Sequence, residues 1–369
     1  MRVALVHDWL TGFRGGEKVL HEFACLFPGA DLYTLIHVPG STSPEIEKLR
    51  IHASALSRLP GAARHYRKLL PLFPLAIESF RLEGYDLVIS NSHSFAKGVR
   101  VTPGTPHLCY CMTPIRYAWD LADEYLGRGL KRVAAAPLLA YLRGWDRRTS
   151  SPMRVTEVVA ISRAIADRVR RCWGRDASVV YPGVDTARFR DLETKRGDFY
   201  FMLGGFVPYK AESLAIEAFR RSGKSLVIAG DGPTRAALER GAPANVRFLG
   251  RVTDRELDDL YARCRALVYP QLEDFGIIAV EAQAAGKPVI AFGHGGALDT
   301  VVDPSDSSGR APTGVHFAEP RPESLVAAVE RFEELEPKLD PGAIRANAER
   351  FSLDNFRAGI RRAIDRVLQ

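Results

Sequence analysis

Features that mark several other protein classes are missing from this sequence. No apolar run approaches the roughly 20 residues that span a bilayer, and the first segment, MRVALVHDWL, is too short and too quickly polar for a signal peptide. The five cysteines form no Cys-x-x-Cys pair and no regular Cys/His spacing, so neither a disulfide framework nor a zinc site is indicated. We therefore expect a cytosolic protein that starts at Met1 and has five buried free thiols.

Signs of bound cofactors are also scarce. The dinucleotide-binding pattern G-x-G-x-x-G does not occur, which disfavours a dehydrogenase. Cys109 and Cys111 fall on one face of a predicted strand, where packing is favoured over a metal-ligand pair. The sequence therefore predicts no metal site.

The net charge of +7 is concentrated in the first half of the chain. Residues 1–150 contain 19 Lys and Arg against 13 Asp and Glu, whereas the rest contains 32 against 31. Within residues 48–77, six cations alternate with apolar side chains and no acid is present, and residues 125–145 repeat the pattern. The cations of the second run are Arg128, Lys131, Arg132 and Arg143.

Basic residues beside exposed apolar ones suit an anionic membrane surface, near which each cation contributes about 1 kcal/mol. An ordinary solvated basic face is the open alternative. Nucleic acid is disfavoured as a partner, because no nucleic-acid motif accompanies the charge.

Short β-prone runs alternate with helical periodicity along the chain, which is of ordinary globular composition with 46% apolar residues. The predicted strands are 2–6, 32–36, 86–90, 107–111, 157–161, 178–181, 199–203, 225–229, 246–249, 266–269 and 288–291. The predicted helices are 17–26, 163–173, 211–221, 233–240, 254–263, 276–285, 341–350 and 353–368. Strands that are apolar on both faces and separated by helices indicate parallel sheets, so the fold class is α/β.

The alternation of predicted strands and helices stops after residue 181 and resumes near residue 199, and the segment between them is polar. At 369 residues the chain is long enough for two domains. We expect one doubly wound, Rossmann-like domain over 1–182 and a second over 198–350. The final helix, 351–369, is expected to pack back on the first domain.

Glu273 and Glu281 stand eight residues apart, with Gly276 between them at a predicted helix start. A strand would deliver Glu273 into the loop at its carboxyl end, and the helix would hold Glu281 about a turn and a half in. Carboxylates suit sugar hydroxyls as hydrogen-bond acceptors, and the free N–H groups of a helix N-terminus suit phosphate. Two Glu residues at this spacing usually have only a structural role, so whether they indicate a binding site depends on the residues around them.

Other strands end in loops that are rich in glycine or carry a cation. These are Gly12–Glu17, Leu203–Lys210, Ala229–Pro233, Leu249–Asp254 and Gly293–Gly296. Loops that follow parallel strands lie at one edge of a sheet, so we expect those of the second domain to meet beside Glu273 and Glu281. The combination predicts a nucleotide-sugar site.

Taken together, these motifs make the chain similar to a family 4 retaining glycosyltransferase of the two-domain GT-B fold, over nearly its whole length. The matching motifs are GGEKVL (15–20), SHSFAKG (92–98), CYCMTPIRY (109–117), VPYK (207–210), AGDGP (229–233) and the Glu pair. The TPIRY element resembles the branch of bacterial mannosyltransferases that build polysaccharides and lipopolysaccharide.

The resemblance implies an interdomain cleft, a donor-binding second domain and an acceptor-binding first domain. It implies transfer of mannose or a related hexose or 6-deoxyhexose from a nucleoside diphosphate, GDP above all, to a lipid-linked or polysaccharide acceptor. It further implies retention at the anomeric carbon, no cofactor, no metal and a peripheral place on the inner face of the plasma membrane. The absence of an Asp-x-Asp pair agrees with metal independence.

The resemblance also assigns roles to single residues. Glu273 would bind the donor sugar's hydroxyls, and Glu281 the ribose. Lys210 would neutralise the departing diphosphate, where a preorganised cation contributes several kcal/mol. His93 would face the acceptor. The other donor-binding candidates are Gly15, Gly16, Gly205, Gly230, Arg251, Val252, Phe275, Gly276 and Ile277, and those on the acceptor side are Met112, Arg116 and Tyr117.

Two positions depart from the family pattern. Met112 stands where the family usually has a His near the C6 hydroxyl of the donor, and Gly205 stands where it usually has an Arg. Met donates no hydrogen bond and Gly has no charge, so a donor without the C6 hydroxyl would suit Met112. Two alternatives stay open: a nucleotide-sugar 2-epimerase of the same fold, and a degenerate transferase that acts as a scaffold.

Overall fold

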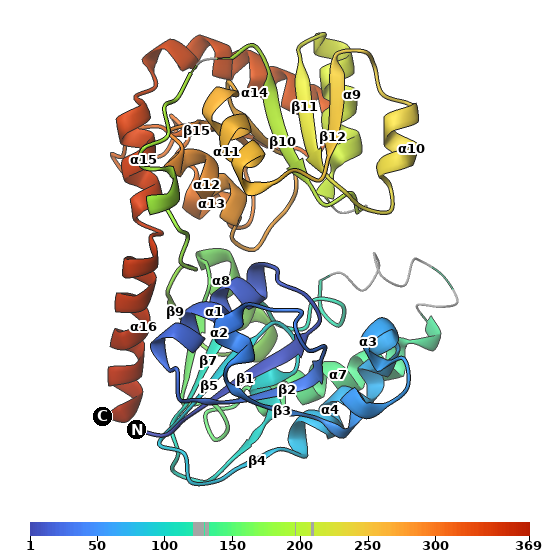
Figure 1. Ribbon diagram of the computed structural model, residues 1–369, viewed down its shortest axis with the longest axis vertical. Coiled ribbons are helices and arrows are strands. Elements are labelled where there is room, and N and C mark those ends of the chain that lie inside the picture. Colours follow the sequence, from blue (N-terminus) through green and yellow to red (C-terminus); the bar gives the residue numbers. More distant parts are fainter. Residues whose placement is uncertain (121–128, 130–132, 196, 208–209) are drawn as a thin grey trace. The chain divides into compact units, whose positions relative to one another are not determined.

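The computed structural model describes residues 1–120, 129, 133–195, 197–207 and 210–369. It divides into two compact units: unit 1 contains Met1–Tyr181 and Phe356–Gln369, and unit 2 contains Pro182–Asn355 (Figure 1). Three cations of the second basic run, Arg128, Lys131 and Arg132, lie outside the described residues.

Unit 1 is built on a parallel sheet that helices cover on both faces (Figure 1). Its strands run in the order β3-β2-β1-β5-β7-β8-β9. Their bounds are β1 Val3–Leu10, β2 Asp31–His37, β3 Arg50–Ala53, β5 Leu87–Ser92, β7 His107–Cys111, β8 Glu157–Ala160 and β9 Ser178–Val179. The order reverses direction between β1 and β5, as it does in doubly wound sheets.

The helices of unit 1 include several short ones between β3 and β5. The helices are α1 Gly15–Leu26, α2 Pro44–Glu47, η1 Ala55–Arg58, α3 Ala62–His65, η2 Tyr66–Leu72, α4 Phe73–Glu78, η3 Ala96–Gly98, α7 Ala136–Thr149 and α8 Arg163–Trp173. A small two-stranded sheet pairs β4 Arg81–Leu82 with β6 Arg100–Val101. The helices α4 and α7 share one core cluster, to which they contribute Phe73, Leu142 and Trp145.

Unit 2 repeats the doubly wound plan with the strand order β12-β11-β10-β13-β14-β15. Its strands are β10 Tyr200–Gly204, β11 Leu226–Gly230, β12 Val246–Gly250, β13 Leu267–Tyr269, β14 Val289–Phe292 and β15 Gly314–Phe317. Its helices are η4 Ala187–Phe189, α9 Glu212–Ser222, α10 Arg235–Arg240, α11 Asp254–Arg263, α12 Ile277–Ala284, α13 Ala297–Thr300, α14 Pro322–Leu335, η6 Glu336–Lys338 and α15 Pro341–Glu349. The order reverses between β10 and β13.

The last helix, α16 (Leu353–Leu368), packs on unit 1 through its apolar face. The ring of Phe356 lies 5.7 Å from the rings of Phe23 and Tyr110. Arg357 pairs with the buried Glu22 at 2.8 Å. Gly359 is required for this approach, because a Cβ there would lie 2.7 Å from a methyl group of Val180.

The predicted fold class is confirmed, since each unit has a parallel sheet covered by helices. The strand 107–111 and the helices 163–173 and 254–263 are correct to the residue. The prediction that all five cysteines are buried is wrong for Cys25, which is exposed near the end of α1, while the other four are buried and all five are free. The strands β3 and β15 and the helices α7 and α14 were not predicted.

Candidate functional site

In both units the strand order reverses at one point, and residues predicted to be functional lie there. In parallel α/β sheets, ligands bind beyond the carboxyl ends of the strands where the order reverses. In unit 2 this point lies between β10 and β13, the strands that precede Lys210 and Glu273. In unit 1 it lies between β1 and β5, which precede Gly15 and His93.

Lys210 and Glu273 form an ion pair across the reversal point of unit 2. Both side chains are about one quarter exposed, so solvent still reaches them. A hydrogen-bond acceptor and a cation stand side by side, and this pairing of charges fits a sugar hydroxyl next to a phosphate.

The loop that holds Lys210 is strained on both sides. Phe206 and Ala211 have positive φ values of 44° and 58°, which non-glycine residues rarely adopt. The buried Glu212 holds this conformation by accepting the N–H of Phe206 at 2.7 Å, and burial raises the pKa of its carboxyl group. Strain that the surroundings maintain is a common feature of ligand-binding loops.

Glycines let the neighbouring loops approach closely. A Cβ at Gly230 would lie 1.9 Å from the carbonyl oxygen of Gly204, at the end of β10. A Cβ at Gly295 would lie 2.4 Å from the carbonyl oxygen of Glu273, and one at Gly296 would lie 2.3 Å from Cα of Phe275. These contacts place the loop after β14 directly against Glu273 and Phe275, and the ends of β10 and β11 directly against each other.

The start of α12 is positioned by Gly276, which has φ 98°. A Cβ there would meet the hydroxyl of Tyr269 at 2.8 Å, so only glycine fits. The helix begins at Ile277, and Glu281 lies on its second turn. Glu281 is buried and accepts the hydroxyl of Tyr261 at 3.2 Å.

The remaining donor-binding candidates of unit 2 lie on the loops after β10 and β12. Gly205 follows β10, and a Cβ there would lie 3.9 Å from Cγ and Cε of Lys210, in ordinary contact. Arg251 follows β12, is exposed and pairs with Asp231 at 3.4 Å. Val252 beside it is half-buried.

In unit 1 the buried Asp8, near the end of β1, organises the loop that carries His93. Its carboxylate accepts the backbone N–H groups of residues 93, 94 and 96 at 2.8, 3.1 and 2.9 Å, and that of Phe95 as well. It also lies 3.1 Å from Nδ1 of His93. Asp8 is not among the site residues that the sequence motifs predict, although a charged residue near the end of an apolar strand is a signal for it.

The imidazole of His93 is half-buried between unit 1 residues. Burial lowers its pKa from the ordinary 6.5, and the negative charge of Asp8 offsets only part of this effect. The ring meets Trp9 edge-on at 4.5 Å. At neutral pH His93 is therefore mainly uncharged and can accept a proton or a hydrogen bond.

A second histidine, His7, links β1 to the start of α1. Its Nε2 lies 3.7 Å from the carboxylate of Glu17. Burial by itself would raise the pKa of the Glu17 carboxyl group. His7 and the backbone N–H of Arg14 stabilise its charged form more strongly, so the net effect is a lowered pKa. A Cβ at Gly16 would lie 3.4 Å from the sulfur of Met112. The structure therefore brings the predicted residues Gly16 and Met112 together beside His7.

Arg116 and Tyr117 surround the His93 loop. The Tyr117 hydroxyl lies 2.8 Å from that of Ser94. The positive charge of Arg116 contributes to the lowered pKa of His93. All three residues predicted on the acceptor side therefore lie at the same edge of the sheet as His93.

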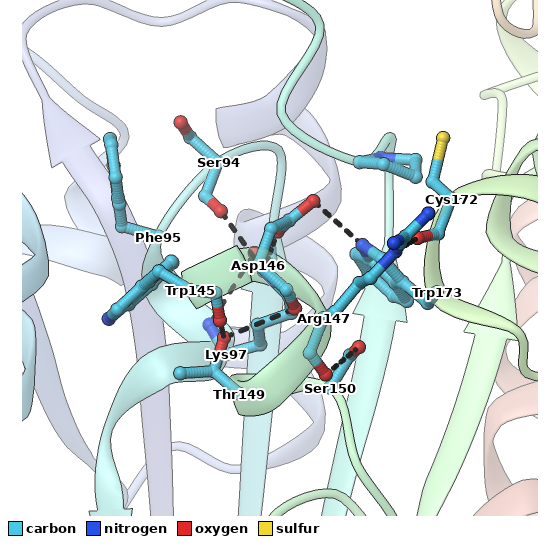
Figure 2. A network of polar contacts seen from close by, with 12 residues as sticks. Ser94, Phe95, Lys97, Trp145, Asp146, Arg147, Thr149, Ser150, Cys172 and Trp173 are labelled. Atoms are coloured by element: carbon cyan, nitrogen blue, oxygen red, sulfur yellow. Dashed lines mark hydrogen bonds and ion pairs between the residues drawn. The ribbon is translucent and has the colours of Figure 1, made fainter. Parts of the chain in front are cut away.

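A buried ion pair stabilises the loop that carries His93 (Figure 2). Lys97 and Asp146 are almost fully buried and pair with each other. Asp146 also accepts the indole N–H groups of Trp119 and Trp173 at 2.8 and 2.7 Å. The Lys97 ammonium lies 5.1 Å from the ring of Trp145 and 4.8 Å from that of Trp173. Such a pair fixes the arrangement of its two side chains, because separating them would leave a buried charge without a partner.

In the part of the chain that the structure describes, no three His, Cys, Asp or Glu side chains are grouped so that they could hold a metal ion. Within the same residues, no helix combines the length and apolar composition that crossing a bilayer requires.

Comparison with known proteins gives the class of protein first. The chain resembles the solved structure of a sucrose-phosphate synthase from Thermosynechococcus elongatus (TM-score 0.72, 17% identity, 100% of this chain and 99% of that one). It also resembles Anabaena HepE in complex with UDP (TM-score 0.69, 18% identity, 99% and 100%). These likenesses show the fold, a two-domain α/β fold of the GT-B class.

Family models then identify the chain. The family model "Glycosyltransferase Family 4" matches residues 13–188, and "Glycosyl transferases group 1" matches residues 184–350. Between them the two models cover nearly the whole chain. The chain belongs to the family 4, group 1 glycosyltransferases.

Curated relatives match over part of the chain. A GDP-mannose-dependent α-(1-6)-phosphatidylinositol monomannoside mannosyltransferase of Mycobacterium tuberculosis is 33% identical over 40% of this chain and 46% of its own length. An uncharacterized glycosyltransferase of Methanocaldococcus jannaschii is 30% identical over 40% of this chain and 43% of its own length. A D-rhamnosyltransferase of Pseudomonas aeruginosa is 35% identical over 30% and 31%. The match spans less than half the length of each relative.

Proposed function

We propose that this glycosyltransferase moves mannose, or a related hexose or 6-deoxyhexose, from a GDP-sugar to a lipid-linked or polysaccharide acceptor. The anomeric configuration is retained and no metal is needed. Unit 2 binds the donor, and unit 1 binds the acceptor. The donor is a substrate, and no further cofactor is required.

The ion pair between Lys210 and Glu273 is the observation that carries this proposal. It stands at the strand-order reversal of unit 2, beside the start of α12. When the donor binds, Glu273 exchanges part of this contact for hydroxyl groups of the sugar. Lys210 then faces the diphosphate, with the N–H groups of Phe275, Gly276 and Ile277 nearby.

The proposed reaction needs no nucleophile from the protein. The bond between the anomeric carbon and the diphosphate oxygen breaks, and the acceptor oxygen forms its bond on the same face of the sugar. The proton of the acceptor hydroxyl passes to the departing diphosphate. Lys210 stabilises the negative charge that develops there, and electrostatic stabilisation of this kind is commonly the largest part of catalysis.

Two observations support a donor close to mannose or its 6-deoxy form. One relative is named a GDP-mannose-dependent mannosyltransferase, and another a D-rhamnosyltransferase, whose sugar lacks the C6 hydroxyl. Met112 packs against Gly16 and offers no hydrogen bond to a C6 hydroxyl. Better turnover with a GDP-hexose than with its 6-deoxy analogue would contradict the 6-deoxy donor while leaving the transfer reaction intact.

Unit 1 also carries features of a membrane-facing surface. The segment 48–77 contains six cations and no acid, and Leu59, Leu72 and Leu75 on it are 44–70% exposed. These features support a peripheral place on an anionic membrane. Such a place suits a lipid-linked acceptor.

A ligand screen followed by a transfer assay tests the proposal. Because a ligand that binds the native state raises the melting temperature, GDP, UDP and ADP can be ranked directly, and GDP is expected to stabilise most. Transfer of sugar from the best donor to an added acceptor is expected to need no divalent ion. Free sugar released without any acceptor would favour the 2-epimerase, and no response to any nucleotide would favour a degenerate scaffold.

A further inference from the structure

Unit 1 contains a cavity of about 440 Å³ that is lined by basic side chains. Its lining consists of Thr11, Arg14 and the run Ala63–Lys68; we call it the basic pocket. The run comes from α3 and η2, and Thr11 follows the last residue of β1. The basic pocket therefore opens at the same edge of the sheet as His93.

The charges of the basic pocket are all of one sign. Arg14, Arg64, Arg67 and Lys68 contribute four cations, and no acidic residue lines the cavity. Among the residues that the structure describes, none of these four has an ion pair. Like charges held together in this way repel one another, so binding an anion relieves an unfavourable interaction.

The chemistry of these side chains points to an anion rather than to a neutral sugar, and four cations match the charge of a phosphate or diphosphate better than that of a single carboxylate. Three of the four cations are arginines, whose planar guanidinium groups bind phosphate oxygens in pairs. Thr11 adds a hydroxyl to the lining. The cavity volume falls within the range of small-molecule sites, which is roughly 300–1,000 Å³.

A single side chain, Trp9, connects the basic pocket with His93. Its ring lies 5.2 Å from the ring of Tyr66, which lines the pocket, and 4.5 Å from that of His93. Two aromatic rings, those of Tyr66 and Trp9, therefore lie between a ligand held in the basic pocket and the histidine assigned to the acceptor. Phosphate in the pocket and a hydroxyl near His93 can belong to one acceptor molecule.

We propose that the basic pocket binds a phosphate or diphosphate group of the acceptor and so selects phosphate-bearing acceptors. This inference rests on the proposed function, because it takes unit 1 as the acceptor-binding part. The phosphate can belong to a membrane lipid headgroup or to the carrier of a growing glycan, and the two sources share this chemistry.

Binding of inorganic pyrophosphate tests the inference without any enzyme assay. A Lys210→Gln background removes the main cation of the donor site, so that the remaining binding reports on unit 1. Adding Arg64→Gln, Arg67→Gln and Lys68→Gln is expected to weaken pyrophosphate binding tenfold or more in calorimetric titrations. These side chains are exposed, so the variant keeps its core.

A matched control replaces three exposed arginines elsewhere on unit 1: Arg171, Arg361 and Arg362, each to Gln. It changes the net charge equally and is expected to bind pyrophosphate like its parent. Equal binding by the pocket variant and the parent would overturn the inference, and so would an equal loss in the control. In transfer assays, the same three pocket substitutions are made in the parent chain, which keeps Lys210, and are expected to raise KM for a phosphate-bearing acceptor while affinity for GDP stays the same.

Vesicles separate the two sources of phosphate. If pyrophosphate displaces the chain from phosphatidylglycerol vesicles, the pocket holds a lipid headgroup. If vesicle binding persists while pyrophosphate inhibits transfer in competition with the acceptor, and the three pocket substitutions remove this competition, the pocket holds the acceptor's own phosphate. Pyrophosphate binding that depends on the pocket, in a chain that transfers no sugar, would contradict the proposed function but not the pocket.

Discussion

At the scale of single residues, the pairing of Lys210 with Glu273 has a direct consequence for catalysis. The variant Glu273→Gln keeps the shape of the side chain but removes the charged acceptor for the sugar hydroxyls. We expect kcat/KM for transfer to fall by roughly 100-fold, the size of effect that loss of one preorganised polar group produces. Affinity for GDP, measured by calorimetry, should change little because GDP carries no sugar at this position.

The control for this prediction is Glu319→Gln, which removes an exposed carboxylate of unit 2 that pairs only with the nearby Arg321 among its described contacts. This variant should transfer sugar like the parent chain. Full activity in Glu273→Gln would show that the proposed mechanism is wrong.

Asp8 is expected to act as a positioning residue for His93. In Asp8→Asn, the side-chain NH₂ group faces backbone N–H groups that donate to the carboxylate in the parent chain. Because these donors lose acceptors, the free energy of unfolding should fall by about 2 kcal/mol or more. All four tryptophans lie in unit 1, so denaturation followed by tryptophan fluorescence reports on this unit alone.

A purely structural role for Asp8 would leave the titration of His93 unchanged. Because the carboxylate raises the pKa of His93, its removal should lower that pKa further. Titration of the His93 ring by NMR checks the shift, and an unchanged or raised pKa would contradict the positioning role.

The sequence predicted several site residues but could not show their partners. Glu273, Glu281 and Lys210 follow predicted strands, so their common edge of the sheet could be inferred. Asp8, Lys97 and Asp146 act through contacts 27 to 88 residues away along the chain, which no local pattern contains.

At the scale of elements, α16 links the last residues of the chain to unit 1. Phe356→Ala should cost about 3–5 kcal/mol of the stability of unit 1, because the ring packs between Phe23 and Tyr110 and its removal leaves a cavity. Urea unfolding followed by tryptophan fluorescence measures this. Arg362→Ala, on the exposed side of the same helix, should have an effect below about 0.5 kcal/mol. Similar losses in both variants would contradict the packing role of Phe356.

The two strands that the sequence did not predict, β3 and β15, share a physical reason. β3 is short and only partly buried, and its residues Arg50 and His52 interact with Asp31 on β2, so pairing rather than composition makes it a strand. β15 has a four-residue sequence, Gly314–Phe317, and exists because it pairs with β14. The helices α8 and α11 are predicted correctly because their amphipathic periodicity is local to each segment.

At the scale of the whole molecule, acid stability should reflect buried histidines. The pKa of His107 is lowered from 6.5 to about 4, chiefly because it is buried. Below pH 6.5 the unfolded chain binds a proton that the native state excludes, so stability falls as the pH decreases towards 4. The loss from one such group is about 1.4 kcal/mol per pH unit.

Urea denaturation between pH 7 and pH 4 measures this dependence. His107→Gln should have a shallower pH slope than the parent chain, although part remains because burial also lowers the pKa values of His93 and His316. An unchanged slope would contradict the assignment to His107.

The uneven charge of the molecule predicts how it binds membranes. The full chain should sediment with phosphatidylglycerol vesicles and not with phosphatidylcholine, and added salt should weaken this binding because it screens exposed charges. Replacing both Leu72 and Leu75 with Ser should lower the bound fraction. Leu368→Ser, at an exposed position of α16, is the control. Equal binding to both kinds of vesicle would contradict an electrostatic surface.

The sequence by itself determined the α/β class, the doubly wound plan and the edge of each sheet at which the candidate site residues lie. It did so because strand and helix periodicity is local, and because loops after parallel strands share one edge. Only the tertiary structure showed that Lys210 pairs with Glu273, that Asp8 holds the His93 loop, and that basic side chains line a pocket beside Trp9. These facts depend on close approaches between residues far apart in sequence, and only the packing of the folded chain specifies such approaches.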